Sequence, residues 1–118
     1  RTHFESVPAQ MRVVDFVENH LMQSSQLLWP VLEEEQLIGL VSLDEVRKIP
    51  AGDREVTTVG AVMRNDLAAL TLAPGTEAKL VLERLGVSAA PLAVVEGSRV
   101  LGLLSAADAA KWMALHQA

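Results

Sequence analysis

Two stretches of the chain are apolar at almost every position, and each is interrupted by a short polar segment. In the first stretch, residues 29–32 and 37–41 flank polar residues 33–36; in the second, residues 90–95 and 100–104 flank residues 96–99. An apolar run, a polar turn and a second apolar run are typical of a β-hairpin. Because the runs do not alternate between apolar and polar, we expect each hairpin to be covered on both faces.

An amphipathic helix is predicted ahead of each hairpin, because apolar residues recur there at helical spacing. In the first helix, which follows Pro8, the polar positions face outward: Arg12, Asp15, Glu18 and Asn19. Its inward positions are Val13, Phe16, Val17, His20 and Leu21. In the second helix the apolar face comprises Ala78, Val81, Leu82 and Leu85. We predict Thr76 as its N-cap and Gly86 as its C-terminal stop.

The chain also repeats itself. Gly39 matches Gly102 at an offset of 63 positions (102 minus 39). The same offset joins Ser42 to Ser105 and Glu45 to Asp108. The prolines Pro30 and Pro91 are 61 positions apart, which predicts a second hairpin turn two residues longer than the first. The polar residues 50–55 contain Pro and Gly and are predicted as a linker between a first copy, residues 1–49, and a second copy, residues 56–118.

Composition limits the classes of function. The chain has 118 residues, half of them apolar, so a core can form, but each copy is too small to bury enough surface alone. We therefore expect the two sheets to pack face to face about a pseudo-twofold axis. Lys and Arg number 10 against 15 Asp and Glu, which disfavours nucleic-acid binding. The absence of cysteine excludes disulfides and thiolate chemistry.

No catalytic or metal-binding pattern stands out in the sequence. The three histidines, His3, His20 and His116, lie far apart and show no metal-ligand spacing. There is no nucleophile–base pair and no carboxylate pair at useful spacing, so we expect no enzyme activity in this chain. No apolar run is long enough to cross a bilayer. The chain begins at Arg1 without a methionine, and we interpret it as a fragment of a longer protein.

The repeated motifs resemble a tandem pair of cystathionine β-synthase (CBS) domains, also called a Bateman module. The resemblance is carried by residues 87–91, 100–105 and Asp108 in the second copy and by residues 28–30 and 37–42 in the first. Residues 58–63 resemble the lead-in helix of a CBS copy, and the first copy lacks its counterpart. The resemblance implies an α/β fold of the α+β type, with two βαββα copies packed sheet to sheet about a pseudo-twofold axis.

A finer resemblance concerns residues 39–50 and 57–60. They are similar to the cytosolic C-terminal CBS pair of bacterial site-2-protease-type intramembrane zinc metalloproteases. The HExxH motif of those proteases is absent here. The resemblance therefore implies a regulatory, non-catalytic and cytoplasmic tail attached to a membrane-embedded protease domain.

CBS pairs often hold adenine nucleotides in the clefts between copies, which implies a site for AMP, ADP, ATP or another adenosine derivative. The family motif places Ser or Thr three residues before an Asp whose carboxylate accepts hydrogen bonds from the ribose hydroxyls. The second-copy site would comprise Ser105, Asp108, Val87, Ser88, Ala89 and Pro91. A weaker first-copy site would comprise Ser42, Glu45, Gln26, Leu27 and Leu28, with Glu in place of Asp.

A Ser followed three residues later by an acidic residue is also a helix capping box, which needs no ligand. Ser42 with Glu45 fits this alternative better than a ribose site, and Ser105 with Asp108 remains open to both interpretations. Basic residues for phosphates are few, and none lies in a glycine-rich phosphate loop: Arg1, His3, Arg64, Arg99 and Lys111.

The last helix carries a stripe that is either core or a homodimer interface: Ala109, Trp112, Met113 and His116. The alternative to nucleotide sensing is therefore a structural role, in which the pair dimerises its parent without a ligand. Bulky residues that would crowd the first cleft, Leu27, Leu28 and Trp29, favour that alternative.

Overall fold

The computed structural model describes residues 3–87, 91–108 and 111. Two small sheets of three strands each form the centre of the molecule, in the orders β1-β2-β3 and β4-β5-β6. In each sheet a short strand pairs in parallel with a hairpin whose two strands are antiparallel. The strands are β1 (Val7–Pro8), β2 (Trp29–Glu33), β3 (Gln36–Val41), β4 (Thr71–Leu72), β5 (Leu92–Glu96) and β6 (Arg99–Leu104).

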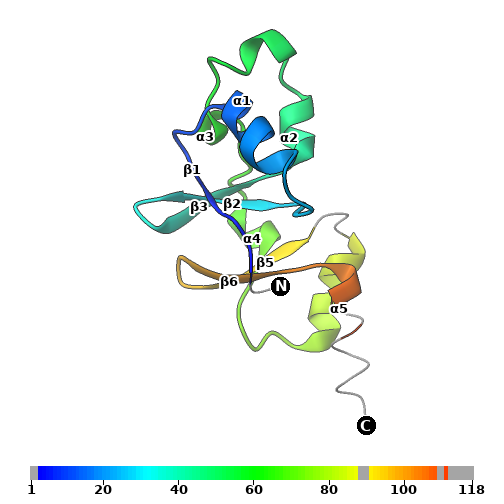
Figure 1. The fold of residues 1–118 in the computed structure, drawn as a ribbon. Helices are drawn as coiled ribbons and strands as arrows, with labels where there is room; N and C mark the ends of the chain where they lie inside the picture. Colours follow the sequence, from blue (N-terminus) through cyan, green and yellow to red (C-terminus); the bar gives the residue numbers. More distant parts are fainter. Residues whose placement is uncertain (1–2, 88–90, 109–110, 112–118) are drawn as a thin grey trace.

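Short helices surround the sheets. Those on the first sheet are α1 (Val13–Phe16), which continues as a π-helix over Val17–Leu21, then α2 (Leu43–Arg47) and α3 (Val59–Val62). A 3-10 helix (Ala51–Asp53) connects the last two, and α4 (Leu67–Leu70) and α5 (Ala78–Val87) follow. Figure 1 shows α1, α2 and α3 on the outer side of the first sheet, α4 between the sheets and α5 at the outer side of the second.

The two sheets pack face to face through a shared apolar layer. Side chains from both sheets and from α4 meet in it: Leu28, Leu37, Leu40, Leu70, Ala93 and Leu103. Each sheet is thus buried on two sides, by helices outside and by the other sheet inside, as the unbroken apolar runs predict. The expected fold class, two βαββα copies packed sheet to sheet, is confirmed.

The first unit has a substantial core of its own. Trp29 and Phe16 are fully buried, and their rings meet edge to face with centroids 5.1 Å apart. Val13, Val31 and Val59 complete the centre of this cluster. The predicted inward face of the first helix is confirmed, since Val13 and Phe16 are buried and its polar positions, Arg12, Asp15, Glu18 and Asn19, are exposed.

The second unit differs from the prediction along α5. Among the described residues its core comprises Leu72, Leu85 and Leu92, with Val81 and Leu104 packed against them. Leu82 was expected to face inward but is 41% exposed, and it is not part of the core that the described residues form. Ala78 lies in the helix, but its side chain is outside the described ones.

Both predicted boundaries of α5 are also wrong. The helix begins at Ala78 and the Val81 amide donates to the carbonyl of Glu77, so Thr76 lies one residue ahead of the N-cap position; its hydroxyl donates to the carbonyl of Ala73 at 2.6 Å. Gly86 does not stop the helix either: it keeps helical geometry, and the helix runs on to Val87. A glycine tolerates the helical conformation as well as the left-handed one, so its presence alone does not end a helix.

The two hairpins are equal in length, which corrects the prediction of a longer second turn. In both, a two-residue turn joins the strands, Glu34 and Glu35 in the first and Gly97 and Ser98 in the second. Trp29 pairs with Val41 as Leu92 pairs with Leu104, so the offset is 63 throughout the hairpin.

The prolines are therefore not equivalent, because Pro30 lies within β2 whereas Pro91 precedes β5. The two-residue difference lies ahead of the hairpin instead. Val7 pairs with Val31, 24 positions later, whereas Leu72 pairs with Val94, 22 positions later. Proline is tolerated at several places near strand starts and is therefore a weak marker of register.

Residues 57–64 pack against the first unit although they follow the predicted linker. The Val59 amide donates to the carbonyl of Met11 at 2.7 Å, and the Gly60 amide donates to that of Ala9 at 2.9 Å. Leu40 and Arg64 exchange two backbone hydrogen bonds of 2.8 Å each. The helix that resembles a second-copy lead-in thus covers the first sheet, and the boundary between residues 55 and 56 stays a prediction based on the repeat.

Candidate functional site

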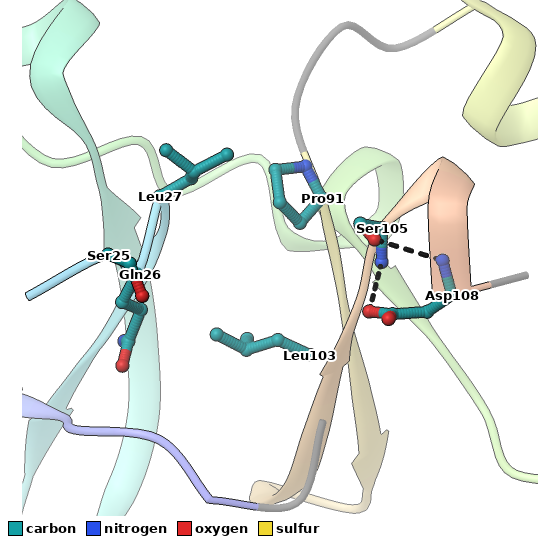
Figure 2. A pocket seen from close by; sticks show the side chains of 7 residues that line it. All are labelled: Ser25, Gln26, Leu27, Pro91, Leu103, Ser105 and Asp108. Carbon is teal, nitrogen blue, oxygen red and sulfur yellow. Dashed lines mark hydrogen bonds between the residues drawn. The ribbon is translucent and has the colours of Figure 1, made fainter.

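A cleft of about 170 Å³ lies where the two units meet. One wall is the loop ahead of β2, with Ser25, Gln26 and Leu27. The opposite wall belongs to the second unit and comprises Pro91, Leu103, Ser105 and Asp108. Figure 2 shows the loop residues on one side, Ser105 and Asp108 on the other, and Leu103 reaching between them. The cleft therefore depends on both units.

Ser105 and Asp108 are held together at the end of β6. Ser105 follows the strand directly, and residues 106–108 turn into a helix. The Asp108 amide donates to the Ser105 hydroxyl oxygen at 3.1 Å, and the Ser105 amide donates to Asp108 Oδ2 at 3.3 Å. This reciprocal pair is a capping box with Asp in place of Glu. It fixes the carboxylate at the edge of the cleft (Figure 2).

The Asp108 carboxylate is ionised at neutral pH. Its pKa is held below the ordinary value of 3.8, first by hydrogen bonds from the side chain and the backbone of Ser105. A smaller contribution comes from the nearby charge of Lys111. The side chain remains partly exposed. An ionised carboxylate that faces a cleft can accept hydrogen bonds from two adjacent hydroxyl groups.

The facing wall is apolar at its surface and polar underneath. Leu27 is 68% exposed and presents its side chain beside the cleft. Gln26, directly before it, is only 5% exposed, and its amide group is taken up by hydrogen bonds within the protein. Leu27 of this wall, together with Pro91 and Leu103 of the wall that carries Asp108, can therefore contact a flat apolar ring, while Asp108 holds a polar group.

The corresponding motif of the first unit is closed. Glu45 Oε1 accepts hydrogen bonds from the Ser42 amide at 2.7 Å and from the Ser42 hydroxyl at 2.9 Å. Ser42 in turn caps α2 by accepting from the Asp44 amide at 3.3 Å. Glu45 is only 6% exposed. The capping-box interpretation of Ser42 and Glu45 is confirmed, and its burial leaves this carboxylate little access to a ligand.

Residues that were predicted for two separate clefts line one cleft in the structure. Gln26 and Leu27 were expected beside Ser42 and Glu45, but they line the cleft of Asp108. The sheets pack face to face, so the loop ahead of one hairpin faces the end of the other, which motif spacing within a copy does not show. Leu28 lines neither side of this cleft but is buried between the sheets.

Several predicted positions lie outside the described residues or side chains: Val87, Ser88, Ala89, Ala109, Trp112, Met113 and His116. Arg1 is also among them. Of the other basic candidates, His3 is exposed and Arg99 begins β6 at the hairpin turn. Arg64 forms an ion pair with Asp66 through two contacts, of which the Nε–Oδ1 contact is 3.1 Å, and this pairing raises the pKa of Arg64.

Among residues 3–87, 91–108 and 111, no three His, Asp or Glu side chains come together in a way that could hold a metal ion. His20 instead stacks on Phe16, and its Nδ1 lies 3.3 Å from Glu5 Oε1. Over the same part of the chain, no helix has both the length and the apolar character to cross a membrane.

Comparisons with solved structures define the class of fold. The chain superposes with a TM-score of 0.78 on a presumptive signal-transduction protein with CBS domains from Burkholderia ambifaria, at 16% identity, over 99% of this chain and 87% of that one. A CBS domain protein from Streptococcus pneumoniae gives 0.74 at 18% identity, over 98% and 83% of the two chains.

The CBS domain of a bacterial CNNM/CorC family Mg²⁺ transporter gives a TM-score of 0.72 at 15% identity, over 94% of this chain and 68% of that one. At these identities the likeness establishes the fold, and the chain adopts the fold of a tandem CBS pair.

Among sequences, the chain is similar to a presumptive zinc metalloprotease, Rip3, from two strains of Mycobacterium tuberculosis. It is 26% identical over 119 aligned positions, which span 95% of this chain and 29% of the relative. The chain therefore spans less than a third of the curated relatives it matches. No family model matches the chain.

Proposed function

We propose that the chain is a regulatory CBS pair that senses an adenine nucleotide or another adenosine derivative in the Asp108 cleft. Binding adjusts the activity of a membrane-embedded zinc metalloprotease to which the pair is attached as a cytoplasmic tail. The observation that carries this proposal is an ionised carboxylate of the second unit in a cleft that also presents apolar side chains of both units, Leu27 from the first and Pro91 and Leu103 from the second.

The chemistry of the cleft suits a ribonucleoside. Asp108 accepts hydrogen bonds from the two ribose hydroxyls, and such charge-assisted bonds are stronger than neutral ones. Leu27, Pro91 and Leu103 contact the base. The cleft volume of about 170 Å³ is below the range of about 300–1,000 Å³ typical of sites for drug-sized ligands. Part of a nucleotide, with its phosphates, therefore extends toward solvent.

The location of the cleft also suits regulation. A ligand that touches both units favours one relative arrangement of the sheets, and such differential affinity is what coupling to an attached domain requires. We assign one ligand to each chain, in the Asp108 cleft, because Glu45 in the first motif is buried as well as bonded to Ser42, whereas Asp108 is partly exposed. In this proposal the pair itself performs no catalysis.

The attachment to a protease rests on the similarity to the presumptive metalloprotease of M. tuberculosis over 95% of this chain. Because the match covers 29% of that relative, the remainder of such a protein would supply the catalytic domain. The chain would act on that domain from the cytoplasmic side.

A thermal-shift screen tests the proposal. The chain is heated with AMP, ADP, ATP, adenosine or S-adenosylmethionine, each over a concentration series. Binding to the folded state at 100 times Kd adds about 2.7 kcal/mol, which raises Tm by several degrees. We expect such a rise with at least one compound, its loss in Asp108→Ala and its retention in Glu45→Ala. No shift with any compound at millimolar concentration would contradict nucleotide sensing.

A second candidate is a ligand-free module that dimerises its parent. The observation in its favour is that two leucines of α5, Leu80 and Leu82, are 47% and 41% exposed. Exposed apolar side chains that gather into a patch mark interaction sites. Sedimentation of the chain with and without Leu82→Asp tests it. A dimer that the substitution dissociates, together with no thermal shift, would favour this role.

A further inference from the structure

Gln26 makes a complete set of hydrogen bonds beneath the wall of the cleft. Its Nε2 donates to the carbonyls of Glu5 and Leu28, and its Oε1 accepts from the Glu5 amide, each at 2.8 Å. Both amide hydrogens and the carbonyl oxygen are thus in use. A ligand in the cleft has no unoccupied donor on this side chain, so Gln26 serves the site in another way than by direct polar contact.

The bonds of Gln26 join the cleft wall to the N-terminal segment. Leu27 and Ser25, its neighbours in the chain, line the cleft, while Glu5 lies 21 residues earlier, just before β1. The Glu5 carboxylate also lies 3.3 Å from His20 Nδ1. Because buried polar groups are costly to leave unpaired, the wall and the backbone at Glu5 keep their geometry together.

The sequence offers this connection in the first copy. The offset between the copies changes from 65 at the first strands (72 minus 7) to 63 in the hairpins, so the counterpart of Gln26 lies among residues 89–91, which are Ala, Ala and Pro. None of these side chains donates or accepts hydrogen bonds, so this sequence cannot form the same side-chain bonds there. The chain therefore combines the accessible carboxylate, Asp108, and the Gln26 connection in the same cleft.

We propose that Gln26 is a positioning residue that couples occupancy of the Asp108 cleft to residues 3–6. Ligand binding then affects the attached domain through the N-terminal segment of the pair. This inference rests on the proposed function, in which the membrane-embedded domain precedes the pair. A ligand that orders the wall at Leu27 stabilises the Gln26 bonds and with them the Glu5 amide. By linkage, anything that orders residues 3–6 raises ligand affinity by the same factor.

Amide hydrogen exchange followed by NMR tests the coupling, with AMP, adenosine and ATP as probes. On saturation we expect exchange at the Glu5 amide to slow at least about fivefold more than at the Val59 amide in the first core, the low end of typical coupling. Gln26→Met removes the hydrogen bonds at similar side-chain length. Gln23→Met is the matched control, because Gln23 is exposed in the same loop.

The coupling is supported if the extra protection at Glu5 occurs in the wild type and Gln23→Met but is lost in Gln26→Met while the probe still binds. Equal protection of Glu5 in Gln26→Met would overturn the inference and leave the proposed function standing. If Gln26→Met does not fold, the wild type alone tests the inference, because a probe that binds without extra protection of the Glu5 amide also overturns the coupling. Failure of all three probes to bind the wild type would overturn both proposals.

Discussion

The two acidic motifs of this chain occupy equivalent positions, 63 residues apart, yet they are used differently. Glu45 is long enough to reach back to both the amide and the hydroxyl of Ser42, and it is buried by doing so. Asp108 is one methylene shorter, makes a longer bond of 3.3 Å to the Ser105 amide and stays partly exposed. A difference of one methylene group in side-chain length therefore separates a carboxylate that only caps a helix from one that can also bind a ligand.

The cores of the two units also differ. The first unit buries Trp29 and Phe16 and is covered by α3, whereas the second buries mainly leucines at the equivalent strand. Among the described residues the second core is the less extensive of the two, and the accessible carboxylate lies on that unit.

The largest expected effect tests the comparison of the two cores. Trp29→Ala should lower the free energy of unfolding by about 3–5 kcal/mol, because it empties the centre of the first core. Leu92→Ala at the equivalent position should cost nearer to about 2 kcal/mol, because it removes a smaller side chain. Urea unfolding measured by circular dichroism compares the two. A larger loss for Leu92→Ala would reverse the assignment of the stronger core.

A second comparison uses two glycines. A Cβ at Gly39 would lie 2.7 Å from the carbonyl oxygen of Arg64 and collide with the side chain of Met63. Gly39→Ala should therefore cost about 1–3 kcal/mol by forcing α3 and β3 apart. A Cβ at Gly86 in α5 would meet no atom of the described residues within 4 Å, so Gly86→Ala should stabilise by about 0.4–1 kcal/mol. Thermal unfolding measures both, and a neutral Gly39→Ala would show that α3 is not packed as described.

Substitutions of the two acidic residues test the comparison of the motifs. Glu45→Ala should cost about 1 kcal/mol through the lost cap and leave ligand binding nearly unchanged. Asp108→Glu should give the second unit the closed cap of the first, with equal or slightly higher stability and weaker binding. Chemical denaturation and calorimetric titration of the same samples measure the two effects. Stronger binding by Asp108→Glu would contradict the role assigned to side-chain length.

The smallest effect is the pH dependence of Asp108. Its pKa in the folded chain lies below the ordinary value of 3.8, so its ionised form contributes stability that is fully present above that value. The contribution is lost as pH falls through the folded pKa. The Tm difference between the wild type and Asp108→Asn should therefore be constant near neutral pH and shrink below about pH 4. A difference that grows in acid would mean that the pKa is raised.

Local patterns predicted the elements well where the chain's own periodicity decides them. Both hairpins and the inward face of the first helix follow from apolar spacing, and the repeat predicts the pairing of two similar sheets. The capping box at Ser42 and Glu45 could also be predicted from the sequence, because three-residue spacing determines whether the two side chains can meet.

The rest depended on contacts between distant residues. Matching Pro30 with Pro91 misplaced the extra residues, because only strand pairing shows that the hairpins are equal. The packing of α3 on the first sheet and the position of Gln26 and Leu27 opposite Asp108 both follow from how the units meet. A stricter use of the expected pseudo-twofold axis would have paired the loop of one copy with the motif of the other.

Calorimetric titration of the wild type, Asp108→Ala and Glu45→Ala with AMP, adenosine and ATP tests the central claim most directly. The account predicts one site per chain for at least one compound and binding at least about tenfold weaker in Asp108→Ala, since a hydrogen bond to a charged group contributes about 1.5–3 kcal/mol. It predicts binding within about threefold of the wild type in Glu45→Ala, a difference below 1 kcal/mol. Two equivalent sites per chain, or unchanged affinity in Asp108→Ala, would contradict the assignment of the ligand to the Asp108 cleft.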